Sequence, residues 1–440
     1  MEQAESPSSS IFATEPIGRL IAKFAIPCVI SLLVNSLYNI VDQIFIGWGV
    51  GYLGNGATNI VFPITIVALS LSLMIGDGGA AYLSLKLGEG DIESAKKGVG
   101  NAIVLVTVVS ILLAAVFLIG IGLPFMMIPG AINSMIRADG SPKYAMFSMA
   151  LGAVINTIFD PVLIFVFHMG VQGAAIATVM GQVASFVFSV IYLPRFKTLR
   201  FDLGSFRLQP RTCVRIASFG ISSFITQFAI TIVMALTNNL LASYGAQSVY
   251  GSEIPLTATG IVMKVNQILI SILVGIAVGT QPIIGYNYGS KNYLRVKKAL
   301  DIAFMISEII SIIAFLVFQF TPMTIVSLFG SEEGLYNEFA VMAFRIFLLL
   351  RPFTGFQTVV SVYLQAVGKP IKSAILSLAR QIIFFVPAAL ILPRFLGVAG
   401  VLWTGPVADG LAFLLSLGLL IYERSQLKVA ERASAAKATA

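Results

Sequence analysis

The sequence predicts an all-α polytopic membrane protein with about twelve transmembrane helices, in two repeated six-helix lobes with a central cavity. Hydrophobic residues make up 57% of the 440-residue chain and charged residues only 11%, whereas soluble domains carry about 25% charged residues. Motifs of the first half return in the same order in the second half, which in a membrane protein indicates a shared cavity and alternating access. Twelve apolar stretches are long enough to cross a bilayer: residues 17–46, 54–85, 98–118, 120–137, 143–167, 170–193, 213–243, 255–286, 296–320, 339–366, 370–393 and 397–422.

Four pairs of short segments define the internal repeat. They are residues 22–27 with 217–222, 82–88 with 285–289, 138–143 with 366–370, and 170–175 with 397–400. The acids Asp42 and Asp160 fall where the second copy has Thr237 and Ala388. This asymmetry predicts that one lobe, the first, is coupled to an ion.

The distribution of positive charge predicts the orientation. Most of the 28 Lys and Arg residues fall in cytoplasmic segments if both termini are cytoplasmic, and the largest cluster lies on the linker between the halves. Cytoplasmic loops carry such an excess, so we expect a multi-pass protein of the inner (plasma) membrane with both termini in the cytoplasm. The predicted domains are a disordered N-terminus (1–16), an N-lobe with helices 1–6 (17–193), a basic linker (194–212), a C-lobe with helices 7–12 (213–422) and a cytoplasmic tail (423–440).

The two halves differ in length at one place. Gly88 and Pro142 are 54 positions apart, whereas their counterparts Gly289 and Pro370 are 81 apart, so the first half is 27 residues shorter here. Two crossings between residues 98 and 137 have about 20 residues each, or about 30 Å, which is barely sufficient. We expect two short helices with a turn near residues 120–124, since a single crossing would move the basic linker outside.

Two helices carry the candidates for an ion site. Asn35, Tyr38 and Asp42 are three, four and seven positions apart and share a face of the first helix, and Asn156 and Asp160 are four apart on the fifth. A carboxylate at membrane depth costs at least ~2.5 kcal/mol and usually faces a cavity, pairs or titrates. Burial favours the protonated form of a carboxyl group, which is the physical basis of a proton site. A structural hydrogen-bonding network, or a hydrated acid near the interface, is the alternative.

Other intramembrane polar residues have less specific interpretations. Asn39 shares the face of the first helix, and Asn133 on the fourth helix and Thr178 on the sixth could approach the same cavity, although such residues commonly join helices. Lys264 and Arg380 lie deep in the eighth and eleventh helices. They could line a substrate cavity together with Asn35, interact with the first lobe, or extend to the interface.

Several classes of function are disfavoured. The chain has two cysteines and one histidine, His168, which leaves little material for a metal site or a catalytic triad. We find no nucleophile paired with a base, so no catalytic residue and no enzyme activity is predicted. The basic residues are spread over many short loops, which favours contact with anionic lipid over nucleic acid. A monomer is expected.

The chain resembles the multidrug and toxic compound extrusion (MATE) family. Residues 37–47 (LYNIVDQIFIG) resemble its first-helix motif. Four further segments match as well: residues 84–91 (SLKLGEGD), 137–142 (RADGSP), 155–161 (INTIFDP) and 280–289 (TQPIIGYNYG). The resemblance is strongest to the prokaryotic branch with DNA-damage-inducible protein F and the staphylococcal-type multidrug efflux proteins. It implies two six-helix lobes that form a V around a cavity.

The resemblance also implies a function and a site. The expected activity is export of small organic cations or drugs by antiport with H⁺ or Na⁺, without any other cofactor. The residues that match the cation-binding positions of this branch, where a sodium ion could also bind, are Tyr38, Asp42, Asn133, Asn156, Asp160 and Thr178.

Three other functions are alternatives to export. A flippase of lipid-linked oligosaccharide from the same superfamily would use a basic cavity to bind pyrophosphate. Lys264, Arg351 and Arg380 allow this, but the acidic N-lobe argues against it. A major-facilitator transporter also has six plus six helices, yet its basic loop motif after the second helix is absent. A membrane-embedded enzyme would need a nucleophile or metal cluster that the sequence does not offer.

Overall fold

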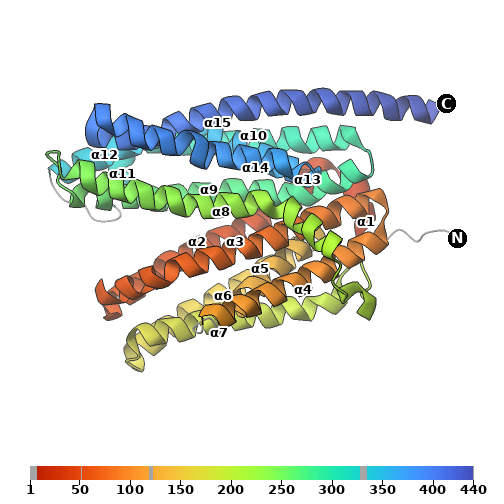
Figure 1. The fold of residues 1–440 in the computed structure, drawn as a ribbon, viewed down its shortest axis with the longest axis horizontal. Helices are drawn as coiled ribbons and strands as arrows, with labels where there is room; N and C mark the ends of the chain where they lie inside the picture. The colour runs from red at the N-terminus through yellow and green to blue at the C-terminus, as the bar shows by residue number, and fades with distance from the viewer. Residues whose placement is uncertain (1–6, 51, 118–121, 328–333, 440) are drawn as a thin grey trace. The chain divides into compact units, whose positions relative to one another are not determined.

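The computed structural model describes residues 7–50, 52–117, 122–327 and 334–439, and every regular element in these ranges is helical (Figure 1). The first half contains α1 (Pro7–Thr14), α2 (Ile17–Val50), α3 (Tyr52–Glu89), α4 (Ile92–Phe117), α5 (Gly122–Ala138), α6 (Pro142–Pro161), the π-helical turn η1 (Val162–Val166) and α7 (Gly170–Tyr192). The linker forms two 3₁₀ turns, η2 (Leu193–Arg195) and η3 (Leu203–Phe206). The second half contains α8 (Pro210–Gly245), α9 (Glu253–Gly289), α10 (Tyr293–Phe320), α11 (Pro322–Ser327), α12 (Leu335–Phe347), α13 (Pro352–Ala366), α14 (Pro370–Leu378), the π-helical turn η4 (Ala379–Phe384) and α15 (Phe385–Thr439).

The helices are long and apolar enough to cross a membrane. Among the described residues nine candidate spans are found, or ten if α12 and α13, which meet at 47°, form one broken span. Two features account for the difference between this number of spans and the predicted twelve. α5 has 17 residues, about 25 Å, which is slightly less than the ~30 Å hydrocarbon core. α15 is two helices, because Gly397 at φ 60° interrupts it with a turn.

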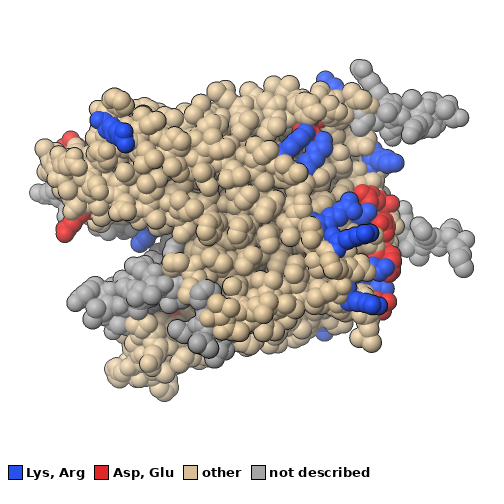
Figure 2. Space-filling view, viewed as in Figure 1, with Lys and Arg blue, Asp and Glu red and all other residues tan. Residues whose placement is uncertain are grey.

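Charged side chains gather toward the ends of the helices. On the face that Figure 2 shows, a broad band without charge covers the middle of the helices. One charged group lies where α3 ends and α4 begins, with ion pairs between Lys86 and Glu89 at 2.6 Å and between Lys97 and Glu93 at 3.3 Å. Such an uncharged band is what a lipid-facing surface requires. The predicted class, a polytopic all-α membrane protein, is therefore confirmed.

The shortened interval of the first half contains two helices, as predicted. α4 and α5 pack against each other, and the expected turn falls partly on residues 118–121, which lie outside the described residues. In the second half, residues 321–351 separate α10 from α13 and contain α11 and α12. That interval is 27 residues longer than residues 118–121. The first half therefore has no counterpart of α11 and α12.

The chain divides into two compact units. Unit 1 comprises Met1–Gln227, Gly275–Leu300 and Tyr363–Ile371, and unit 2 comprises Phe228–Val274, Asp301–Val362 and Lys372–Ala440. The core of unit 1 lies between α3, α4 and α5, where Val99, Ile132 and Met135 are fully buried. The core of unit 2 includes Val262 of α9 and Phe344 of α12. The predicted lobe boundaries at 17–193 and 213–422 stay a prediction.

Close packing of α6 on α7 depends on two glycines. A Cβ atom added to Gly181 would lie 2.5 Å from the carbonyl oxygen of Gly152, and one added to Gly152 would lie 2.8 Å from that of Gly181. Both distances are shorter than real carbon–oxygen contacts, so the two backbones touch at this crossing. The same Cβ on Gly181 would also lie 3.3 Å from the Cβ of Asn156. The crossing thus fixes the position of a candidate site residue.

Replacing Gly181 with valine should force α6 and α7 apart. Overpacking typically costs about 1–3 kcal/mol, so the melting temperature of the purified protein should fall by several degrees. Gly260→Val is the matched control, because an added Cβ there meets no atom within 4 Å. Equal melting temperatures for the two variants would contradict the proposed role of the crossing.

A buried carboxylate between α5 and α6 holds the linker. Asp139 is fully buried, and it accepts hydrogen bonds from the Tyr192 hydroxyl at 2.7 Å, the Lys197 backbone N–H at 2.8 Å, and the backbone N–H and hydroxyl of Thr198. Burial raises the pKa of the Asp139 carboxyl group, while these hydrogen bonds favour its charged form. One side chain therefore ties the end of α7 and the start of the linker to the turn after α5.

Asp139→Asn should destabilise the protein. Two donors share each carboxylate oxygen, and an amide nitrogen in place of one oxygen leaves two of them without an acceptor. A buried unsatisfied group costs about 1–3 kcal/mol, which thermal unfolding of the purified protein would detect. Glu93→Gln, at a side chain that is 62% exposed, is the control. An unchanged melting temperature for Asp139→Asn would show that the linker is held by other contacts.

Candidate functional site

The two predicted acids meet inside unit 1. Asp42 lies on α2 and is half-buried, and Asp160 lies at the end of α6 and is fully buried. They meet because α2 packs along α6. The two carboxyl groups are close enough to hydrogen-bond to each other. Because a carboxylate can only accept, a hydrogen bond between the two groups requires a proton on one of them.

Asn156 connects this acid pair to α7. It lies one turn before Asp160 and is 2% exposed. With its amide nitrogen toward Asp160, it donates to Oδ2 at 3.1 Å and accepts from the hydroxyl and backbone N–H of Thr178, each at 3.2 Å. Three helices, α2, α6 and α7, therefore hold the residues. Oδ1 of Asp42 has no hydrogen-bond donor among the other described residues, so it remains available for an ion.

The other candidate residues of the first helix precede Asp42 on α2. Tyr38 is half-buried one turn before Asp42, close enough for the charges of both acids to act on its hydroxyl group. Asn35 is exposed. The side chain of Asn39 lies outside the described residues. The structure therefore brings together Tyr38, Asp42, Asn156, Asp160 and Thr178 of the six predicted cation-binding residues.

The sixth predicted residue, Asn133, belongs to a different polar network. Its amide nitrogen donates to Ser148 at 3.3 Å, and its amide oxygen accepts from Ser189 at 3.2 Å. Ser148 lies eight residues before Asn156 on α6, which is about 12 Å along a helix. This network joins α5, α6 and α7, and the role of Asn133 in cation binding stays a prediction.

The predicted substrate-cavity residues divide between the two units. Asn35 belongs to unit 1, whereas Lys264 and Arg380 belong to unit 2. Lys264 is exposed on α9, and Arg380 donates from Nε to Asp409 Oδ1 at 2.8 Å. A common cavity for these three residues stays a prediction.

A second buried acid in unit 1 has partners that the sequence pattern did not connect. Asp77 of α3 accepts from the Ser134 hydroxyl at 2.9 Å and from the Ser223 hydroxyl at 2.9 Å, and Arg137 lies 3.8 Å away. Ser134 and Arg137 are three apart on α5 and hydrogen-bond to each other at 2.8 Å. The spacing of three places Ser134 and Arg137 on one face of α5, and this is the sequence signal for a common partner on another helix.

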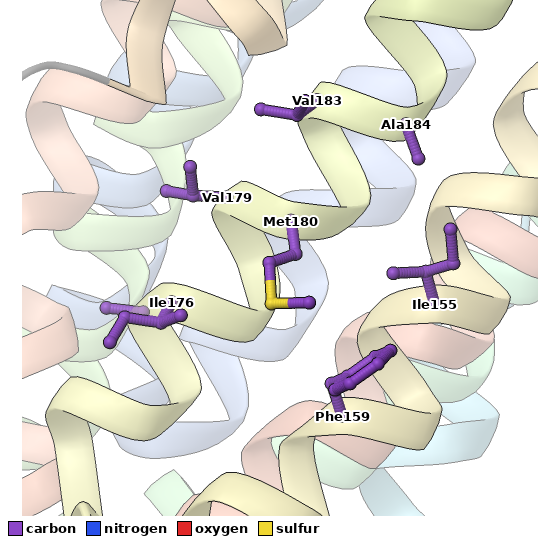
Figure 3. A pocket seen from close by; sticks show the side chains of 8 residues that line it. Ile155, Phe159, Ile176, Val179, Met180, Val183 and Ala184 are labelled. Atoms are coloured by element: carbon purple, nitrogen blue, oxygen red, sulfur yellow. The ribbon is translucent and has the colours of Figure 1, made fainter.

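An apolar groove of about 590 Å³ lies between α6 and α7 (Figure 3). Figure 3 shows Met180 of α7 pointing toward Ile155 and Phe159 of α6. Its lining is entirely apolar: Ile155, Phe159, Ala175, Ile176, Val179, Met180, Val183 and Ala184. The groove therefore offers no group to a charged ligand, and the acid pair is the part of these helices suited to an ion.

The acid pair can hold a single small cation. Either a proton shared by the carboxyl groups or a sodium ion on carboxylate and amide oxygens would neutralise one buried charge, because hard cations prefer oxygen ligands. No group of three or more His, Cys, Asp or Glu residues that could hold a metal occurs in the described part of the chain.

Comparisons with known proteins agree with this architecture. The MatE family model matches residues 27–121 and 222–391. The chain is 25% identical to the multidrug export protein MepA of Staphylococcus haemolyticus (strain JCSC1435) and 23% identical to that of Staphylococcus aureus (strain MRSA252). Each alignment covers 95% of this chain and 96% of the relative.

Solved structures share the fold. A MOP superfamily transporter from Pyrococcus furiosus Vc1 (DSM3638) matches with a TM-score of 0.87 at 21% identity, over 98% of this chain and 100% of that one. A crystal structure of MATE in complex with MaL6 matches with a TM-score of 0.87 at 22% identity, over 97% and 99%. Since the family model covers more than half of the sequence, the chain belongs to the MatE family, which consists of membrane transporters and not of enzymes.

Proposed function

We propose that this transporter exports small organic cations and drugs by antiport with protons or sodium ions, through alternating access. The observation that carries the proposal is the contact between the carboxyl groups of Asp42 and Asp160. Asp160 lies within the candidate membrane span Pro142–Val166, and Asp42 lies on α2 four residues beyond the candidate span Ile17–Tyr38. A charged carboxylate in such an apolar helix is costly unless it is paired or functional.

The acid pair supplies a physical basis for exchange. Two adjacent carboxylates in an environment of low dielectric constant cannot both stay charged without a compensating cation. A proton or sodium ion can compensate one charge, and so can the positive group of an organic cation. If the two kinds of cation compete for the same oxygens, each one leaves when the other binds. Such mutual exclusion couples their opposite movements.

The relatives support the choice of cargo. Both MepA proteins are named multidrug export proteins and align with nearly the whole of this chain.

The acid pair can be tested by ethidium efflux from proteoliposomes that contain the purified protein. An imposed proton or sodium gradient should drive efflux, and the gradient that does so identifies the coupling ion. Asp42→Asn and Asp160→Asn should each lower the rate of efflux at least tenfold. An amide is uncharged, so it neither binds and releases a proton nor attracts a cation as a carboxylate does. Asp301→Asn, at a carboxylate that is 46% exposed, should leave the rate unchanged. Gradient-driven efflux at the original rate in Asp160→Asn would refute the proposal.

Thr178→Val tests the support of the acid pair from α7. The change removes the hydroxyl that bonds to Asn156 and keeps a side chain of similar shape. A lost hydrogen bond is worth about 1 kcal/mol, so the concentration of the coupling ion that gives half-maximal efflux should change about fivefold. Thr107→Val, whose hydroxyl bonds only to a carbonyl within its own helix in the described structure, is the control. No difference between the two variants would contradict the role of Thr178.

A further inference from the structure

Unit 2 buries two arginines around one aspartate. Arg351 lies at the break between α12 and α13 and is 3% exposed, and Asp409 of α15 is also 3% exposed. Nε of Arg380 donates to Asp409 Oδ1 at 2.8 Å. Nη1 of Arg351 is 3.6 Å from Asp409 Oδ2, which is too long for a hydrogen bond. The cluster therefore carries two positive charges and one negative charge.

Several polar atoms of this cluster lack partners. Nε and Nη1 of Arg351 and Oδ2 of Asp409 are buried and form no hydrogen bond within the described part of the chain. Buried polar groups in proteins are almost always satisfied, and a buried charge without a counter-charge is costly. One negative charge with oxygen acceptors would balance the net charge of the cluster and offer acceptors to its arginines.

The arrangement shows where such a ligand would enter. The side chain of Arg380 is 23% exposed, whereas that of Arg351 is 3% exposed. Arg380 belongs to η4, and π-helical turns are frequent at functional sites. Its remaining nitrogens belong to a planar fork that matches the two oxygens of a carboxylate. A ligand would therefore contact Arg380 first, and the unpaired nitrogens of Arg351 lie deeper in the same cluster.

The surroundings restrict the chemistry of the ligand. Phe385 and Ala408, which lie near Arg380 and Asp409 in sequence, belong to one buried apolar cluster. The guanidinium of Arg351 lies 5.7 Å from the centre of the Phe347 ring. A net charge of one and an apolar environment favour a singly charged anion, because a doubly charged one loses more hydration energy than the site returns.

We propose that Arg380, together with Arg351 and Asp409, binds the carboxylate of a singly charged organic anion with an apolar body. This site lies within unit 2 and uses none of the residues of the acid pair. It extends the range of ligands beyond cations and stands whether or not the chain exports ethidium.

Sodium benzoate is the probe, titrated by calorimetry into the full-length protein in nanodiscs of phosphatidylcholine without any ion gradient. Saturable binding is expected, with affinity at least tenfold weaker in Arg380→Gln. Arg394→Gln, at an exposed arginine of the same unit, should bind benzoate as the unmodified protein does. Circular dichroism and the melting temperature of each variant report whether it is folded. Since Arg380 is partly exposed, its variant is a safer test than one at Arg351.

Several results would overturn the assignment. One is the absence of benzoate binding to the unmodified protein. Another is an equal affinity for benzoate in folded Arg380→Gln, which would mean that the arginines only stabilise the break between α12 and α13. Sodium phosphate that binds as tightly as benzoate would contradict the preference for a single charge. Nanodiscs with phosphatidylglycerol form the last arm. Unchanged benzoate affinity supports a soluble carboxylate, whereas its loss would reassign the site to a lipid phosphodiester.

Discussion

The contact between Asp42 and Asp160 is the constraint on which the rest of unit 1 depends. A membrane interior penalises every uncompensated charge, so a pair of adjacent carboxyl groups is stable there only if protons or cations neutralise part of its charge. The pair also requires that α2 and α6 stay close along their length. The glycine crossing of α6 and α7 and the bridge from Asn156 to Thr178 serve the same geometry. The closest packing of these helices and the proposed ion site therefore fall in one small region.

The shortened interval of the first half leaves this region intact. The segment without a counterpart corresponds to α11 and α12 of the second half, whereas the acid pair and its partners lie on α2, α6 and α7. α5 still contributes the buried core residues Ile132 and Met135, and Asn133 still joins it to α6 and α7. The difference in length between the two halves is thus confined to the region before α5, which starts at Gly122. An ion site on the other helices does not require the lost segment.

The sequence revealed what depends on helical periodicity and missed what depends on packing between helices. Asp42 and Asp160 stand out as acids in apolar stretches, and the spacing of Asn156 and Asp160 places them on one face. The partners of a side chain on another helix follow from crossing positions, which no local pattern encodes. Asn133 illustrates this limit, because its hydrogen bonds with serines of α6 and α7 could not be predicted from the sequence. The partners of Asp77 and Asp409 come from helices distant in sequence for the same reason.

The two halves use one helical plan with opposite charges. Where the first half has Asp160 on its fifth helix, the second has Ala388, yet the same helix of the second half contributes Arg380 eight residues earlier. A π-helical turn interrupts both helices, two residues after Asp160 in one and around Arg380 in the other. In each case the irregular turn adjoins a charged group that the apolar surroundings cannot solvate. A duplicated bundle can thus keep its packing while each copy acquires a charge of its own.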